Sequence, residues 1–245
     1  MLGSCFSDEI GEQMQQRYLH VTCNPFGTLY NPLSIAQAIN MTAVPELIEH
    51  EGLWHAMSHH GIFSRGSREE AEQAVRGSIE TMQKVLREAS VVIVTFGTAW
   101  VYEKDGAIVG NCHKLPESCF TRRRLTVAEI VAAWQPILAQ YPDKHWLFTV
   151  SPIRHIRDGL HENQLSKATL LQAVEQLGDY FPSYEIMLDE LRDYRFYADD
   201  LVHPSSMAVN YIWERFVDCF CTNQTKNELV LQHKRWKHEH HRLLH

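Results

Sequence analysis

A serine near the start of the chain and an Asp–His pair near its end have the residue types of nucleophilic acyl chemistry. Ser4 stands in the glycine-led turn Gly3-Ser4-Cys5-Phe6, directly before a predicted helix. Asp200 and His203 are separated by two residues. That spacing lets the carboxylate accept a hydrogen bond from Nδ1–H, which leaves Nε2 free to take a proton. A serine hydroxyl needs such an oriented base before it attacks a carbonyl carbon. The pattern predicts Ser4 as nucleophile, His203 as base and Asp200 as orienter.

Each part of this pattern also has an explanation without catalysis. Ser4 fits a helix N-cap, and Asp200 with His203 fits a surface ion pair before a helix. Cys5 is a rival nucleophile, because a helix N-terminus favours a thiolate. We expect its side chain to face the core side of the turn, so Ser4 is preferred.

Three clustered histidines are the candidates for a metal site. His55 and His59 are spaced i, i+4, and His60 follows. No carboxylate converges on them in the sequence, whereas metal-bound histidines usually have such partners. We therefore predict surface histidines, no metal and no cofactor.

Short apolar runs alternate with longer helical patterns along the chain. Residues 91–96 and 146–150 are typical of strands buried on both faces. Shorter extended segments are expected at 20–22 and 184–188, and a hairpin at 100–109 around Asp105-Gly106. The predicted helices cover residues 8–18 with Ser7 as N-cap, 31–41, 67–89, 126–141, 163–180 and 206–221. This alternation predicts a parallel sheet between two helical layers, a three-layer α/β/α domain over residues 1–225, with a polar helix or tail at 226–245.

The ligand site of such a sheet lies at the carboxyl ends of its strands. Five segments would meet there: 3–6, 27–28, 97–100, 151–155 and 200–203. The proposed nucleophile and base are thus expected to face one crevice, although they are far apart in sequence.

Several of these segments together resemble the GSCFA family. The ends of the resemblance are Gly3-Ser4-Cys5-Phe6 and Asp200-Leu201-Val202-His203-Pro204-Ser205. Supporting segments are 24–28, 96–100, 151–155 and 162–168, so the similarity extends from residue 3 to about 216. The family usually has Ala at the fifth position of its motif, where this chain has Ser7.

The family is similar to the SGNH hydrolases, and the resemblance implies their flavodoxin-like fold. It implies that Ser4 is the nucleophile, that Gly27 supplies a backbone oxyanion donor, and that Asp200 and His203 complete the triad. The third SGNH block normally supplies an oxyanion asparagine, and Gly97-Thr98-Ala99-Trp100 has none. Thr98, Asn24 or Asn163 are the candidates to replace it.

These implications predict a serine-dependent hydrolase of carbohydrate or small acyl esters that passes through a covalent acyl-enzyme. The backbone N–H groups of Ser4 and Gly27, with Thr98, would form the oxyanion hole. Four residues are expected to contact substrate: Asn24, Trp100, Arg154 and His155. An O-acyltransferase acting on a sugar hydroxyl stays open, as does a catalytically silent glycan- or peptide-binding domain of the same fold.

Composition and charge narrow the range of partners. The formal net charge is −7, with 23 basic against 30 acidic residues, which disfavours nucleic acid. The one basic run, Arg122-Arg123-Arg124, is interpreted as a solvated turn, with an anionic-substrate contact as the alternative. Six cysteines without framework spacing indicate free thiols. We see neither a secretory signal nor a membrane span, and expect a cytoplasmic protein.

The start of the chain carries one further expectation. Only Met1 and Leu2 precede Gly3, whereas a strand that delivers a nucleophile turn usually has about 5–6 residues. We predict that the natural protein begins upstream, with a β-branched or Leu-rich run ending at Leu2, and that the 245-residue form is less stable.

Overall fold

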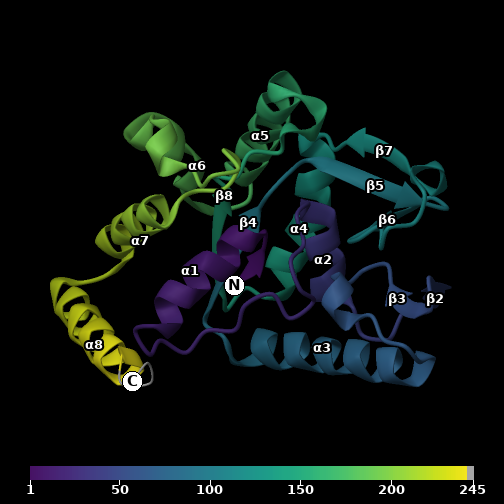
Figure 1. Ribbon diagram of the computed structural model, residues 1–245, viewed down its shortest axis with the longest axis horizontal. Helices are drawn as coiled ribbons and strands as arrows, with labels where there is room; N and C mark the ends of the chain where they lie inside the picture. Colours follow the sequence, from purple (N-terminus) through teal and green to yellow (C-terminus); the bar gives the residue numbers. More distant parts are fainter. Residues whose placement is uncertain (242–245) are drawn as a thin grey trace.

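A computed structural model describes residues 1–241 and has a four-stranded parallel sheet at its centre (Figure 1). The strands are β1 (Leu2–Gly3), β4 (Val91–Phe96), β8 (His145–Val150) and β9 (Asp179–Phe181), in the order β1-β4-β8-β9. All three pairings are parallel, and β4 and β8 match over their full length from Val91↔His145 to Phe96↔Val150. The predicted strands at 91–96 and 146–150 are therefore confirmed.

The side chains of the sheet alternate between two apolar clusters. On β4, Val92, Val94 and Phe96 pack into one cluster, and Ile93 into the other. Residues of α2 (Pro32–Asn40), α3 (Arg68–Glu88), α4 (Val127–Gln140) and α5 (Leu160–Val174) fill the first cluster. Residues of α1 (Cys5–Gln15) and α7 (Ser206–Phe220) fill the second. This period of two is typical of a strand buried on both faces, and the chain has the predicted three-layer, flavodoxin-like α/β/α fold.

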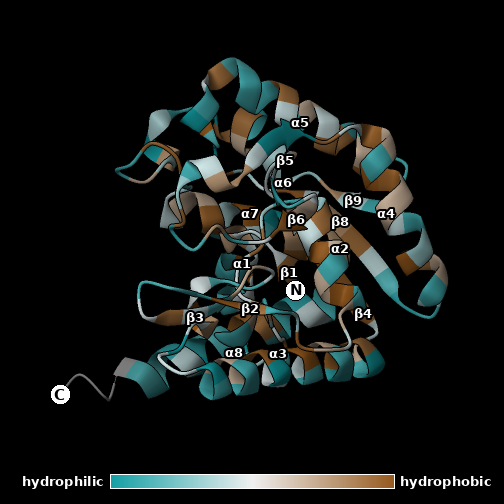
Figure 2. Cartoon of the chain, turned by 90° about the vertical axis from the view of Figure 1, so that its right-hand side faces the viewer, coloured by the Kyte–Doolittle hydropathy of each residue, from teal (hydrophilic) through white to brown (hydrophobic). Residues whose placement is uncertain are grey.

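Helix boundaries follow local capping signals. Asn31, Ser67 and Thr126 each accept a hydrogen bond from a backbone N–H in the first turn of α2, α3 and α4. Such caps satisfy donors that have no partner within the helix. Bands of hydrophilic and hydrophobic residues alternate along the helices (Figure 2), as expected where one face of each helix is buried.

Two small antiparallel sheets stand outside the central one. The hairpin β2 (Leu47–His50) and β3 (Leu53–Ala56) was not predicted. In the second sheet, β5 (Trp100–Lys104) pairs with β6 (Ala107–Val109), which confirms the predicted hairpin, and also with β7 (Thr121–Arg124). The interpretation of Arg122–Arg124 as a solvated turn is therefore wrong. The strand tolerates three arginines because each one is paired with a carboxylate, of Asp158, of Glu103 and Glu129, and of Glu162 respectively.

Both edges of β1 have backbone partners. One edge pairs with Val94 and Thr95 of β4. Along the other, the amino group of Met1 donates to Thr22 O at 2.6 Å, Asn24 N–H donates to Met1 O at 3.0 Å, and Leu29 N–H donates to Gly3 O at 3.0 Å. The predicted extended run at 20–22 leads into this segment without forming a strand.

Several boundaries differ from the prediction: the helix expected at 163–180 is α5 and ends at Val174, and the helix expected at 8–18 ends at Gln15. The first helix begins at Cys5 and not at residue 8, so its N-cap is Ser4, while Ser7 lies buried inside the helix. The strand predicted at 184–188 is wrong: β9 lies at 179–181, and α6 (Ser183–Glu185) and the π-helix η4 (Ile186–Leu191) follow it. Tyr184, Met187 and Leu191 are buried, and their spacing fits a helix better than a strand.

The remaining elements are short helical turns and the C-terminal helix. The turns are η1 (Gly61–Phe63), η2 (Glu117–Cys119), η3 (Ile156–Asp158) and η5 (Tyr194–Phe196). The predicted polar tail at 226–245 falls largely in α8 (Asn223–His241), whose Leu229 packs into the α1–α7 cluster, and its last four residues, 242–245, lie outside the described residues. Among residues 1–241, no helix combines the length and apolar character needed to cross a bilayer.

Candidate active site

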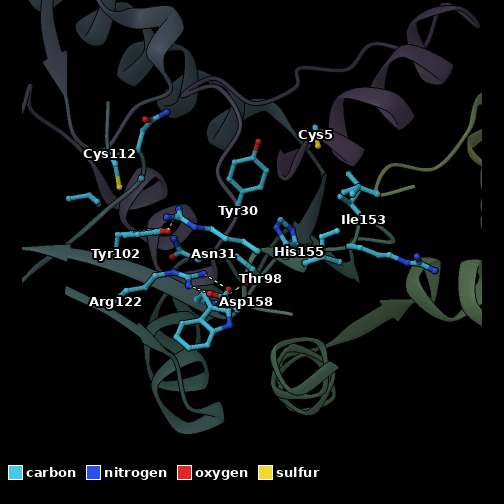
Figure 3. Close-up of a pocket in the computed structure, with 18 of the residues that line it drawn as sticks. Cys5, Tyr30, Asn31, Thr98, Tyr102, Cys112, Arg122, Ile153, His155 and Asp158 are labelled. Carbon is cyan, nitrogen blue, oxygen red and sulfur yellow. Dashed lines mark hydrogen bonds and ion pairs between the residues drawn. The ribbon is translucent and has the colours of Figure 1, made fainter. Parts of the chain in front are cut away.

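A pocket of about 510 Å³ opens at the carboxyl ends of the central strands (Figure 3). Its wall combines residues from the start of α1, the loop after β4, the loop after β8, the small sheet and the loop before α7. The lining residues used below are Cys5, Tyr30, Thr98, Trp100, Tyr102, Arg122, Arg154, His155 and His203. This is the end of a doubly wound sheet at which ligands bind.

Ser4 is delivered to this region by a turn that requires glycine. Gly3 has φ +130°, and a Cβ there would lie 2.1 Å from Thr95 O. Ser4 itself is the extended N-cap of α1, and its N–H donates to Thr95 O at 3.2 Å. Its side chain is fully buried, and Oγ has no hydrogen-bond partner in the described chain.

Cys5 packs against the core cluster of α1 and α7, as expected, but it also lines the pocket. Cys5 is the first residue of α1, and its side chain lies at the wall of the pocket (Figure 3). Burial raises the pKa of its thiol, although the backbone N–H groups of Cys5 and Phe6 act in the opposite direction. A thiol with a raised pKa is mostly protonated at neutral pH and is a weak nucleophile.

Asp200 and His203 are in direct contact. Oδ2 of Asp200 lies 2.6 Å from Nδ1 of His203, and Oδ1 accepts hydrogen bonds from the N–H groups of Val202 and His203. These backbone hydrogen bonds, of which the one from His203 is the largest cause, and the contact with the ring lower the pKa of Asp200 to about 2. The carboxylate is therefore ionised over the working pH range. Nε2 of His203 has no partner in the described chain, and no hydrogen bond joins His203 to Ser4.

His155 lies beside Ser4, deeper in the pocket. Its backbone N–H donates to Oδ1 of Asn163 at 2.9 Å, and its ring meets Tyr30 edge-on at 5.8 Å between centroids. Its Nε2 is buried without a partner. A Cβ placed on Gly97 would lie 3.3 Å from both this Nε2 and the Cβ of Ser4. Burial, followed by the charges of Lys167 and His203, lowers the pKa of His155 to about 3.

Lys167 was missed by the analysis of the sequence. Its side chain is 1% exposed, and Nζ donates to Gly97 O and to Ser151 O, each at 2.7 Å. It thereby ties together the ends of β4 and β8, from which the loops carrying Thr98 and His155 depart. Desolvation lowers its pKa to about 7. The available signal was its position on the buried face of a predicted helix, three residues before the buried Leu170.

Two predicted site residues are used to build the turn and do not reach the pocket lining. Asn24 accepts a hydrogen bond from Gly3 N–H at 2.8 Å and donates to Asp8 at 2.8 Å. Its amide is thus consumed in holding β1 to α1. The N–H of Gly27 donates to Asn24 O at 2.7 Å, and Gly27 at φ +74° packs against His60. The N–H of Gly27 is therefore taken, one N–H of the Asn24 amide is taken by Asp8, and neither residue lines the pocket.

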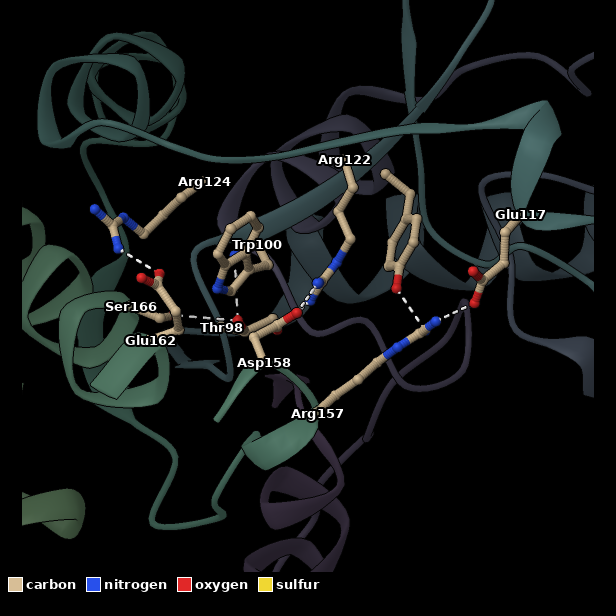
Figure 4. A network of polar contacts seen from close by, with 10 residues as sticks. Thr98, Trp100, Glu117, Arg122, Arg124, Arg157, Asp158, Glu162 and Ser166 are labelled. Atoms are coloured by element: carbon tan, nitrogen blue, oxygen red, sulfur yellow. Dashed lines mark hydrogen bonds and ion pairs between the residues drawn. The ribbon is translucent and has the colours of Figure 1, made fainter. Parts of the chain in front are cut away.

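Thr98 lines the pocket, but its polar groups have protein partners. Its N–H donates to Tyr30 O at 3.0 Å, and Oγ1 bonds to Ser166 Oγ at 3.0 Å and to the N–H of Trp100 at 3.1 Å (Figure 4). The N–H of Thr98 is therefore taken, and its hydroxyl can donate to a ligand only where Ser166 is the donor of the bond between the two hydroxyls.

The small sheet forms the outer wall of the pocket. The guanidinium of Arg122 lies over the rings of Trp100 and Tyr102, at 4.5 and 5.1 Å from their centroids, and pairs with Asp158 (Figure 4). Trp100 Nε1 and Arg122 Nε are buried without partners. On the opposite side, Arg154 stacks over Tyr197 at 4.0 Å.

The histidines at 55 and 59 are buried, so their assignment to the surface is wrong. His59 stacks on Phe26, and its two ring nitrogens contact the hydroxyls of Ser58 and Ser78, both at 2.8 Å. Its nitrogens are thus fully used within the protein. In the described part of the chain no three His, Cys, Asp or Glu side chains are grouped so as to hold a metal ion.

Four buried side-chain polar atoms in residues 1–241 lack a hydrogen-bond partner: Ser4 Oγ, Trp100 Nε1, Arg122 Nε and His155 Nε2. Three belong to residues that line the pocket, and the fourth belongs to the residue before Cys5. Unpartnered buried groups are rare and costly in native proteins. Their concentration at one pocket indicates a site whose polar groups are kept for a ligand.

Comparison with known proteins gives one match. The family model described as the GSCFA family matches residues 1–216, which include every residue of the pocket. Neither the curated proteins nor the solved structures contain a match to the chain.

Proposed function

The chain belongs to the GSCFA family, and from that membership and the pocket at its strand ends we propose that it is a serine-dependent ester hydrolase. Ser4 is the nucleophile, His203 the general base and Asp200 the residue that orients the base. The observation that carries the proposal is the unpartnered, buried Oγ of Ser4, the residue before the pocket-lining Cys5, together with an Asp–His pair joined at 2.6 Å whose His203 lines the same pocket.

The hydrogen bonds of the Asp200–His203 pair suit it to this role. The two backbone N–H groups on Oδ1 of Asp200 fix the carboxylate, and Oδ2 is left to hold Nδ1–H of His203. Nε2 of His203 then remains the proton acceptor. Hydrogen bonds between nucleophile and base are often long before substrate binds, and the 45% exposed ring of His203 has room to move toward Ser4.

The reaction proceeds in two halves. His203 Nε2 takes the Oγ proton as Ser4 attacks the ester carbonyl carbon, and the carbonyl oxygen becomes an oxyanion. The carbon–oxygen bond to the alcohol breaks, and the alcohol leaves with the proton from His203. Water then gives a proton to His203 and attacks the acyl-enzyme, which releases the acid and restores Ser4.

Cys5 is the rival nucleophile, and its chemistry argues against it. It is nearer the open pocket than Ser4, but burial raises its thiol pKa. No base contacts its sulfur in the described chain, whereas an activated cysteine normally has a histidine or another cation nearby.

The pocket favours a small acyl or carbohydrate ester as substrate. Its volume of about 510 Å³ falls in the range of small-molecule sites. Trp100 and Tyr102 supply aromatic surface, while Trp100 Nε1 and Arg122 Nε are N–H donors without acceptors. Aromatic surface combined with spare donors matches a sugar ring with its hydroxyl oxygens.

A fluorophosphonate probe tests the proposal directly, because it labels only activated serines well. We expect labelling at Ser4 in the wild type and in Cys5→Ser, and none in Ser4→Ala or His203→Ala. Turnover of short-chain nitrophenyl esters should follow the same order. Absence of labelling in the folded wild type, with no ester turned over, would instead support a silent binding domain. Acylated sugar formed when free sugar is added would redirect the proposal to acyl transfer.

A further inference from the structure

We propose that His155 is a further catalytic residue, which stabilises the oxyanion by donating a hydrogen bond from Nε2–H. This inference rests on the proposed function, since it concerns the oxygen of the ester that Ser4 attacks. It gives the site the side-chain donor that the segment Gly97–Trp100 lacks.

The other candidate backbone donors already have acceptors within the protein: the N–H groups of Ser4, Gly27 and Thr98 donate to Thr95 O, Asn24 O and Tyr30 O respectively. The amide of Asn24 donates to Asp8, and the hydroxyls of Thr98 and Ser166 share a hydrogen bond in which either can be the donor. Asn163 accepts the N–H of His155 with Oδ1 and is not among the residues that line the pocket. His155 Nε2 differs from all of them because it is buried and has no partner.

The position of His155 Nε2 relative to Ser4 follows from the distances of both to a Cβ placed on Gly97. A Cβ at Gly97 would lie 3.3 Å from Nε2 of His155, 3.3 Å from Cβ of Ser4 and 3.0 Å from Tyr30 O. The side chains of Ser4 and His155 thus face one point beside Gly97, where even a methyl group would be in tight contact. A carbonyl oxygen bound near this point while its carbon meets Ser4 Oγ would lie within reach of Nε2–H.

The backbone that carries the imidazole is held from two sides. Asn163, which is buried in α5, accepts the backbone N–H of His155. Lys167, one turn further along α5, binds Gly97 O and Ser151 O. The donor therefore stands on rigid elements, as oxyanion stabilisation requires.

The protonation state of the ring is consistent with a donor and inconsistent with a base. Burial and the neighbouring charges of Lys167 and His203 lower the pKa of His155 to about 3. At neutral pH the ring is therefore uncharged, and a neutral imidazole polarises a carbonyl by donating its N–H. So weak a base would not deprotonate serine effectively, and that task stays with His203.

Two nearly isosteric substitutions separate a donor from mere bulk. In His155→Gln the side-chain amide can place an N–H close to the position of Nε2, whereas His155→Glu has similar size and no N–H. We expect His155→Glu and His155→Ala to lower kcat for a nitrophenyl ester by about 10²–10³-fold, as loss of one oxyanion donor does. His155→Gln should recover at least about tenfold of that loss, with KM little changed.

The pH profile distinguishes donor from base. In His155→Gln the acidic limb of kcat/KM should keep the wild-type midpoint, because the base that takes the Ser4 proton and its orienting carboxylate are unchanged. Equal activity of the Gln and Glu variants, or full activity in His155→Ala, would overturn the inference while wild-type labelling at Ser4 keeps the proposed function. Failure of the wild type to label would reject the proposed function itself. Thermal unfolding of each variant identifies any that do not fold, and the Gln–Glu comparison uses only folded protein.

Discussion

The buried amine of Lys167 should make the stability of this protein rise with pH above neutrality. Lys167→Met keeps most of the side-chain volume and removes the titrating group. It also leaves Gly97 O and Ser151 O without their donor, at a cost of about 1–3 kcal/mol for each buried acceptor. Removal of a buried amine offsets part of that cost, so the pH dependence is a sharper test than the stability at one pH.

The sign and size follow from the two protonation states. The pKa of Lys167 is lowered from its ordinary 10.5 to about 7 in the folded protein. Between these values the unfolded chain binds more protons than the folded one, so the free energy of unfolding rises with pH. From pH 7 to pH 9 this single group contributes a gain of roughly 2 kcal/mol.

Urea unfolding of the wild type and of Lys167→Met at pH 7 and pH 9, under reducing conditions, measures the difference. The amino group of Met1 also has a lowered pKa, but it is present in both proteins and cancels. The wild type should gain roughly 2 kcal/mol more than the variant over this interval. Parallel changes in the two proteins would refute a buried lysine with a strongly lowered pKa.

Three further results are expected. Asp200→Asn should lower ester turnover by up to about 10³-fold, no more than loss of the nucleophile, because the amide cannot hold the same ring tautomer; unchanged turnover would remove Asp200 from the mechanism. Gly97→Ala would bring a Cβ into tight contact with Tyr30 O, His155 and Ser4 and should reduce kcat more than tenfold in protein that remains folded, whereas wild-type kcat would show that this contact point is not used. Burial lowers the pKa of His59 and of His113 to about 4, so the free energy of unfolding should fall as the pH is lowered from 6.5 to 4. The loss is roughly 2 kcal/mol per ring from pH 7 to pH 5, and urea unfolding with equal midpoints at these two pH values would contradict it.

The parts of the fold predicted from the sequence are those with strong local signals. β4 and β8 are continuous apolar runs, and the helices after Asn31, Ser67 and Thr126 begin at side chains that cap them. Such signals depend on neighbours in sequence. They gave the layers and the parallel sheet correctly.

The errors come from contacts between distant segments. β7 is a run of arginines that becomes a strand because carboxylates at 103, 129, 158 and 162 neutralise it. The buried His55 and His59 depend in the same way on partners from other segments. No local pattern encodes these partners.

The residues of the candidate site also fall into two groups, those positioned by local contacts and those positioned by distant segments. The contact between Asp200 and His203 is local, since only two residues separate them, and the structure has it at 2.6 Å. The proximity of His155 to Ser4 is set by two strand ends and by the absent side chain of Gly97. The sequence indicated that His155 would face the crevice, but not that its Nε2 would lie beside the nucleophile without a partner.

Alternate residues of β5 either pack in the core or line the pocket. Val101 is fully buried in the core, while its neighbours Trp100 and Tyr102 face the pocket. In the paired strand, Arg122 lies opposite Tyr102 and shares its side of the sheet. Positions 100, 102 and 122 can therefore change while the core residue between them stays. The residues that line the pocket can therefore vary one at a time at alternate positions of β5 and β7, without repacking of the domain that holds Ser4.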